Sequence, residues 1–280
     1  MRHETGEQSG NLGRRLYTQR WLPDLAPRAA IVLAHGLAEH SGRYGELARR
    51  LTARGFALHA LDHRGHGRSQ GPRANIERFA YVVDDLGALI AGVRAEDPAR
   101  PLFLLGHSMG GAVALSYALQ NPTLLDGLLL SAPLLGVDPN VPPLKQLAGR
   151  VLSLLAPSVG LLTLPSDQIS HDPVVVREYD NDPLVFHGPI PARTLIELLA
   201  ALDWLRERTP ELRMPVLALH GTGDRLVPLE FVAPVYERLG SPDRKVLQYE
   251  GLYHELFNEP ERARVYADLE AWLDARLPAA

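Results

Sequence analysis

Short apolar runs recur along the chain and alternate with longer segments in which apolar residues return at helical spacing. Runs that are apolar throughout, such as 29–34 and 56–61, are typical of strands covered on both faces. We predict strands at 14–22, 29–34, 56–61, 101–105, 128–130, 216–219 and 245–249. We predict helices at 44–54, 79–93, 112–119, 229–239 and 260–277. This alternation indicates an α/β fold with a mostly parallel central sheet and helices on both faces.

The regular alternation is absent at two places. Residues 1–13 are polar, and we expect them to form a flexible N-terminus. Between 136 and 213 proline is frequent, and the stretch 151–166 carries no charge. We interpret 136–213 as a helical cap (lid) inserted into a core formed by 14–135 and 214–280, although ordinary core packing of its leucines is an alternative. An apolar cap over a polar site would suit acyl chains.

Composition excludes several classes of function. The net charge is −4, with 29 basic and 33 acidic residues interspersed, so we expect no nucleic-acid partner. The absence of cysteine excludes disulfides, thiolate metal sites and a cysteine nucleophile. Neither an apolar signal segment nor an apolar run long enough for a membrane helix occurs. We therefore expect a soluble, cytoplasmic protein. Transient contact of the uncharged cap with a membrane surface is an alternative, and the oligomeric state is left open.

One motif organises the candidate chemistry. Ser108 lies between a predicted strand and a predicted helix, in the run Gly106-His107-Ser108-Met109-Gly110-Gly111. A G-x-S-x-G match in this context predicts a nucleophile elbow, a sharp turn whose flanking residues need to be small. The alternative is a serine that only caps the following helix.

A serine nucleophile needs a base, and the base needs a carboxylate that orients it. Asp224 and His254 follow Ser108 in the chain order that an elbow hydrolase requires, each just after a predicted strand. An Asx-turn role for Asp224 and a capping or core role for His254 are the alternatives. The backbone amides of Leu37 and Met109 are well placed to stabilise a developing oxyanion.

The other histidines do not form a known metal motif. His35, His40, His63 and His66 are near one another in sequence, but neither H-E-x-x-H nor H-x-H-x-D-H occurs. The glycine-rich runs also match neither G-x-G-x-x-G nor a P-loop. We expect no metal and no cofactor.

Four motifs together resemble the bacterial monoacylglycerol lipases of the α/β-hydrolase fold. They are His35-Gly36-Leu37-Ala38-Glu39-His40-Ser41-Gly42-Arg43-Tyr44, Asp62-His63-Arg64-Gly65-His66-Gly67-Arg68-Ser69, the Ser108 motif and Tyr253-His254-Glu255. The resemblance implies a serine hydrolase that cleaves monoacylglycerol to fatty acid and glycerol without a cofactor. It implies Ser108 as nucleophile, His254 as base and Asp224 as its orienter, with Leu37 and Met109 as the oxyanion amides. It also implies that the substrate pocket is supported by His35, Gly36, Glu39, Arg43 and His107.

Several alternatives stay open at this point. Glu39 and Arg43 could instead form a structural ion pair. The same machinery would serve a broad carboxylesterase, a lysophospholipase or a thioesterase. Dehalogenase and epoxide hydrolase chemistry is disfavoured because serine, not aspartate, occupies the nucleophile position. A ligand-binding receptor on the same scaffold is the alternative from another class, and the intact Ser108, Asp224 and His254 argue against it.

Overall fold

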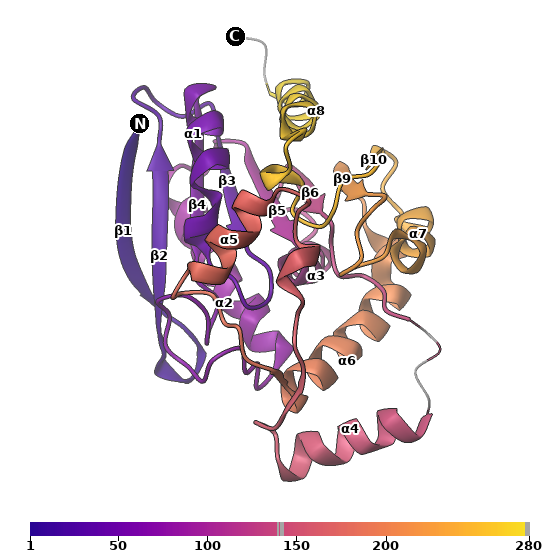
Figure 1. The fold of residues 1–280 in the computed structure, drawn as a ribbon. Coiled ribbons are helices and arrows are strands. Elements are labelled where there is room, and N and C mark those ends of the chain that lie inside the picture. Colours follow the sequence, from indigo (N-terminus) through magenta and orange to yellow (C-terminus); the bar gives the residue numbers. More distant parts are fainter. Residues whose placement is uncertain (139, 141–142, 278–280) are drawn as a thin grey trace.

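An eight-stranded sheet forms the centre of the molecule (Figure 1). The computed structural model describes residues 1–138, 140 and 143–277. The strand order is β1-β2-β4-β3-β5-β6-β9-β10. Their bounds are β1 Arg2–Ser9, β2 Arg15–Leu22, β3 Ala29–Ala34, β4 Phe56–Leu61, β5 Leu102–His107, β6 Gly127–Ser131, β9 Val216–Gly221 and β10 Arg244–Tyr249. The strands from β4 to β10 pair in parallel, whereas β1 and β2 are antiparallel additions at one edge.

Helices cover the sheet, and a separate group of elements connects β6 to β9. The helices of the core are α1 Gly45–Ala53, α2 Phe79–Glu96, α3 Met109–Gln120, α7 Leu229–Arg238 and α8 Arg262–Asp274. The connection contains α4 Pro143–Leu155, β7 Gly160–Leu162, α5 Pro173–Asn181, β8 Ile190–Pro191 and α6 Ala192–Arg208. The fold is the α/β-hydrolase arrangement that the sequence predicts.

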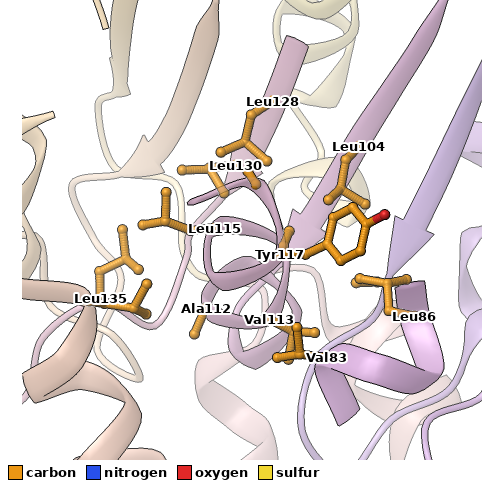
Figure 2. Close-up of a cluster of buried hydrophobic side chains, with 14 of the residues drawn as sticks. Val83, Leu86, Leu104, Ala112, Val113, Leu115, Tyr117, Leu128, Leu130 and Leu135 are labelled. Atoms are coloured by element: carbon orange, nitrogen blue, oxygen red, sulfur yellow. The ribbon is translucent and has the colours of Figure 1, made fainter. Parts of the chain in front are cut away.

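The apolar strands are explained by the two cores they separate. Along β3, Ile31 packs into the core beneath α1 and α8, whereas its neighbour Val32 packs into the core beneath α2 and α3. Successive side chains of a strand point to opposite faces, so a strand covered on both sides must be apolar at every position. Figure 2 shows the second of these cores, where Tyr117 and Val113 of α3 lie beside Leu86 of α2 and Leu104 of β5.

The expectation of a flexible N-terminus is wrong. Residues Arg2–Ser9 form β1, which pairs with β2 along its whole length, from Arg2 opposite Leu22 to Ser9 opposite Arg15. His3 stacks on Trp21 with a ring separation of 5.0 Å, and Glu4 pairs with Arg20. β1 is an edge strand with mostly exposed residues, so it lacks the apolar signal from which we predicted the other strands.

The segment 136–213 is only partly helical, and positions 139, 141 and 142 of it lie outside the described residues, as do 278–280. The uncharged stretch 151–166, which we expected to be helical as part of the cap, holds the end of α4 and then β7. α4 ends at Leu155, shortly before Pro157, because proline lacks the N–H that a continuing helix would use. β7 then pairs antiparallel with β8, and α4 packs against α6 (Figure 1).

None of the helices in the described part of the chain combines the length and the apolar character needed to cross a membrane.

Candidate active site

Ser108 stands at a sharp turn between β5 and α3. Its backbone has φ 53° and ψ −122°, a conformation that costs a non-glycine residue about 1–3 kcal/mol. Hydrogen bonds of the Ser108 backbone hold this turn. The Ser108 N–H donates to the Ser131 carbonyl at 3.1 Å, while the Ser108 carbonyl accepts from the amides of Gly111 at 2.9 Å and Leu134 at 2.8 Å. The strained turn is therefore fixed from the neighbouring strand and from the following helix.

The glycines of this turn are required by close backbone contacts. A Cβ on Gly110 would lie 2.1 Å from the Ala34 carbonyl oxygen, and one on Gly106 would lie 2.3 Å from the Gly110 carbonyl oxygen. Both distances are far below any van der Waals contact, so β3, β5 and α3 can approach this closely only with glycine at both positions. The local sequence therefore determines where the Ser108 side chain stands.

Asp224 and His254 form a buried pair at the ends of β9 and β10. His254 Nδ1 donates to Asp224 Oδ2 at 2.7 Å, and each residue is 5% exposed. Asp224 Oδ1 accepts from the amides of Leu226 and Val227, both at 2.9 Å. The bond at Nδ1 leaves Nε2 as the basic nitrogen of a neutral His254.

The pair favours its charged forms. Burial raises the pKa of Asp224, but the charge and hydrogen bond of His254 and the Val227 amide outweigh it and leave the pKa below its usual value. Burial lowers the pKa of His254, but Asp224, followed by Glu255 and Glu39, outweighs it and raises this pKa above 6.5. His254 is therefore a stronger base than a free imidazole.

His220 lies behind this pair and was missed from the sequence. Its Nδ1 accepts from the Tyr236 hydroxyl at 2.8 Å, and its Nε2 donates to the Val227 carbonyl at 2.8 Å. The same Nε2 lies 3.5 Å from Asp224 Oδ2. Burial lowers the pKa of His220, so this neutral ring packs against the carboxylate without neutralising it. No local motif marks His220, because its partners come from the loop after β9 and from α7.

A nearly buried network connects Glu39 and Arg43 to Glu255, a residue to which the sequence analysis assigned no role. Arg43 makes two bonds to the Glu255 carboxylate, with Nη2 at 2.8 Å from Oε2, and lies 3.3 Å from Glu39 Oε2. Glu39 Oε1 accepts from the Gly36 amide at 2.5 Å and from the Tyr44 hydroxyl at 2.7 Å. The ion pair that was the alternative for Glu39 and Arg43 is present, and its Glu39 also lines the cavity of the site.

The two histidines near Ser108 are held neutral. Burial, and then the nearby charge of His254, lower the pKa of His107 to about 4. The rings of His107 and His254 lie 4.8 Å apart, and His107 Nδ1 lies 3.1 Å from the Ser131 carbonyl. Burial also lowers the pKa of His35 to about 4, while its Nδ1 donates to the Gly36 carbonyl and its Nε2 accepts from the His63 amide. Both ring nitrogens of His35 are thus occupied.

Many of these residues line a cavity of about 330 Å³, whereas His35, Arg43, His220 and Asp224 are not among its lining residues. Its polar end is lined by Glu39, His107, Ser108, His254 and Glu255. Its apolar wall includes Leu134, Ile169, Leu195, Leu198, Leu202 and Leu226. Gly36, Leu37 and Met109 also line it, and within the described residues neither the Leu37 N–H nor the Met109 N–H has a backbone acceptor. The arrangement offers a hydroxyl, a base and two free amides beside a surface for an apolar chain.

The side chains closest to a metal-ligand arrangement lie outside this cavity. His171, Glu259 and Glu261 offer ligand atoms within 4.8 Å of one another. Both nitrogens of His171 already face a carboxylate, with Nδ1 2.5 Å from Glu259 and Nε2 3.3 Å from Glu261. We interpret this group as an ion-pair cluster that joins the segment before α5 to the loop after His254.

Comparison with known proteins extends over nearly the whole chain. A family model described as Hydrolase_4, serine aminopeptidase S33, matches residues 26–261. A monoacylglycerol lipase of Mycolicibacterium smegmatis is 40% identical over 266 residues, or 95% of this chain and 95% of that protein. Phospholipase YtpA of Bacillus subtilis is 34% identical over 258 residues, or 91% of this chain and 98% of that protein. The crystal structure of a monoacylglycerol lipase from Paleococcus ferrophilus has a TM-score of 0.83 at 30% identity, with 93% of this chain and 99% of that chain covered.

Proposed function

The chain belongs to the monoacylglycerol lipase family of the α/β-hydrolase fold, and we propose that it hydrolyses monoacylglycerols to a free fatty acid and glycerol. One observation carries the proposal. A single cavity combines Ser108 and His254 with a buried polar end and an apolar wall. An ester of a polyol with a long acyl chain matches both ends of such a cavity.

The proposed reaction proceeds through an acyl-enzyme. Ser108 Oγ attacks the ester carbonyl while His254 takes the hydroxyl proton, and Asp224 stabilises the imidazolium that forms. The amides of Leu37 and Met109 donate to the oxyanion of the tetrahedral intermediate. The bond to glycerol then breaks, and His254 returns the proton to the departing glycerol oxygen. Water deprotonated by His254 attacks the acyl group on Ser108, releases the fatty acid and restores the Ser108 hydroxyl.

The polar end would receive the glycerol. We assign its support to Gly36, Glu39 and His107, which line the cavity, and to His35 and Arg43, which contact lining residues without lining it themselves. Neutral His107 can donate or accept a hydrogen bond without introducing a charge beside the ester.

We assign residues 136–213 as the cap that covers this site. Exposed apolar side chains cluster in α4 and β7, with Leu154 72%, Leu155 81% and Leu162 49% exposed, and Leu162 also lines the cavity. An apolar outer surface that continues into the cavity is suited to transient docking on a membrane, from which an insoluble substrate could enter.

A second candidate, phospholipid or lysophospholipid hydrolysis, is favoured by the similarity to Phospholipase YtpA. The two candidates share the catalytic groups and differ at the polar end, which would have to accept a charged headgroup instead of glycerol. In the site, Arg43 is already bonded to Glu255 and Glu39, so a phosphate would compete with two carboxylates for it. We therefore favour the neutral polyol ester.

Fatty-acid release tests the proposal. Monooleoylglycerol, a lysophosphatidylcholine and p-nitrophenyl butyrate are compared for the wild type, for Ser108→Ala and for the control Ser116→Ala. Ser116 is buried in α3, the helix that follows Ser108, and among the described residues its hydroxyl has no hydrogen-bond partner. We expect preferred turnover of monooleoylglycerol, a loss of at least about 10³-fold in Ser108→Ala and wild-type rates in Ser116→Ala.

Other outcomes would change the assignment. Preference for the lysophospholipid would favour the second candidate. Turnover of the aryl ester alone would retain a serine esterase and remove the lipase assignment. Absence of turnover with every ester would favour a ligand-binding receptor on the same scaffold.

A further inference from the structure

We propose that Glu255 is a positioning residue that, through Arg43, holds the loop of His254 against the loop that supplies the proposed oxyanion amide, and that its charge also acts on His254. This inference rests on the proposed roles of Ser108 and His254. Glu255 follows His254 directly in the chain, so any displacement of its carboxylate is transmitted to the backbone of the base.

Glu255 is anchored from several directions. Its carboxylate receives two bonds from Arg43 and one from the Asn258 side chain at 2.8 Å, and its backbone amide donates to the Ile169 carbonyl at 2.7 Å. The residue is 6% exposed. Bidentate pairs between arginine and carboxylate are geometrically selective, so Arg43 restricts both the position and the rotation of the carboxylate.

Arg43 continues this link to the oxyanion loop. It also pairs with Glu39, whose Oε1 accepts from the Gly36 amide, one residue before the proposed oxyanion amide of Leu37. This loop is strained, because Ala38 has φ 69°. A strained loop keeps its conformation only where its surroundings hold it. Glu255, Arg43 and Glu39 therefore join the base and the oxyanion amide through side chains that are all nearly buried.

The charge of Glu255 also acts on the base. The titratable and charged groups around His254 come from five elements and their loops: Glu39 and Arg43 after β3, His107 on β5, Tyr179 on α5, His220 and Asp224 on and after β9, and Glu255 after β10. Glu255 and Glu39 add to the effect of Asp224 in raising the pKa of His254. Removal of the Glu255 charge should therefore let His254 lose its proton at lower pH.

Two substitutions separate charge from geometry. Glu255→Gln removes the charge and retains most of the shape, while Glu255→Asp retains the charge and shortens the side chain. Glu270→Gln is the matched control, because Glu270 lies on α8 outside the cavity and is a nearly buried carboxylate paired with Arg50 of α1 and with Arg54.

The readout is the rate at which a fluorophosphonate labels Ser108 as a function of pH, together with the melting temperature of each variant. Labelling needs the nucleophile and its base but no ester substrate. If the wild type is labelled but releases no fatty acid, the proposed function is wrong. The role of Glu255 can still be measured from the labelling rates. A wild type that is not labelled at all would overturn the inference as well.

For Glu255→Gln we expect the acid midpoint of labelling to fall by about 0.5 pH unit or more and the plateau rate to fall about tenfold. For Glu255→Asp we expect the wild-type midpoint and a reduced plateau, and for Glu270→Gln both wild-type values. A folded Glu255→Gln protein with the wild-type midpoint overturns the charge role. A wild-type plateau in Glu255→Asp overturns the positioning role, and this result remains readable if Glu255→Gln does not fold.

Discussion

The rim of the sheet and the proposed cap, residues 136–213, differ in how they are held together. At the rim, Asp224 and His254 are each 5% exposed, and every oxygen of the Asp224 carboxylate is hydrogen-bonded. In the proposed cap, Leu154 and Leu155 are 72% and 81% exposed at the end of α4, a helix that packs against α6.

The difference follows from the chemistry that each region would perform. Proton transfer and oxyanion stabilisation depend on hydrogen-bond distances and angles, so a displacement of an ångström can cost a large factor in rate. Contact with an acyl chain or a lipid surface depends mainly on the apolar area removed from water, which has no directional requirement. The rim should therefore tolerate almost no substitution, whereas the cap should tolerate many and respond only where a lipid is present.

The largest effect is expected at the rim, for Asp224→Asn. An amide at this position keeps the shape but presents an N–H or a neutral oxygen to His254, so that the base loses its orientation and its charge partner. We expect kcat on monooleoylglycerol to fall by about 10³- to 10⁴-fold with little change in KM. The control is Asp243→Asn, because the Asp243 side chain is half exposed and, among the described residues, pairs with Arg276 alone. Near-wild-type turnover by Asp224→Asn would remove Asp224 from the role of orienter.

The elbow gives the next largest effect, and here the readout is stability. Gly110→Ala places a Cβ 2.1 Å from the Ala34 carbonyl oxygen, so that β3 and α3 must separate. We expect destabilisation by about 3 kcal/mol or more, a fall in melting temperature of about 6–12 °C, and loss of activity in the fraction that folds.

Gly92→Ala is the matched control for Gly110→Ala. Gly92 is also helical, in α2, but a Cβ there meets nothing within 4 Å. We expect Gly92→Ala to be neutral or stabilising by up to about 1 kcal/mol, since alanine favours helix. Equal melting temperatures for the two variants would show that the close approach at the elbow does not require glycine.

The sequence predicted those features whose physical cause lies in neighbouring residues of the chain. β3 and β4 have the predicted bounds, because a strand covered on both faces is apolar at each position. The turn at Ser108 was predictable for a similar reason, since the glycines that its geometry requires lie within a few residues of it. The order of Ser108, Asp224 and His254 along the chain follows the order of the strands that support them.

The features that the sequence did not reveal depend on distant partners or on edges. Glu255 is defined by Arg43, 212 residues away, and no pattern along the chain indicates that pair. β1 is polar because it lies at an edge, so its pairing with β2 has no hydrophobic signature. β7 lies in the uncharged stretch 151–166, which we expected to be helical as part of the cap. α4 ends within this stretch, shortly before Pro157.

The cap side of the comparison is tested by Leu154→Ser together with Leu155→Ser, for which the smallest effect is expected. Both side chains already face solvent, so we expect the melting temperature and the turnover of a soluble aryl ester to stay at wild-type values. On monooleoylglycerol carried in phospholipid vesicles we expect a loss of about 5- to 30-fold. Each leucine that enters the bilayer surface contributes on the order of 1 kcal/mol to binding, and serine forfeits this gain.

Leu25→Ser is the control for the cap variant, because Leu25 is 83% exposed and lies in the loop between β2 and β3, away from the cap. A vesicle-specific loss in the cap variant but not in Leu25→Ser would assign lipid docking to α4. Equal vesicle activity in the wild type and both variants would exclude a role of Leu154 and Leu155 in docking on lipid. Selection of the substrate would then rest on the apolar wall of the cavity alone.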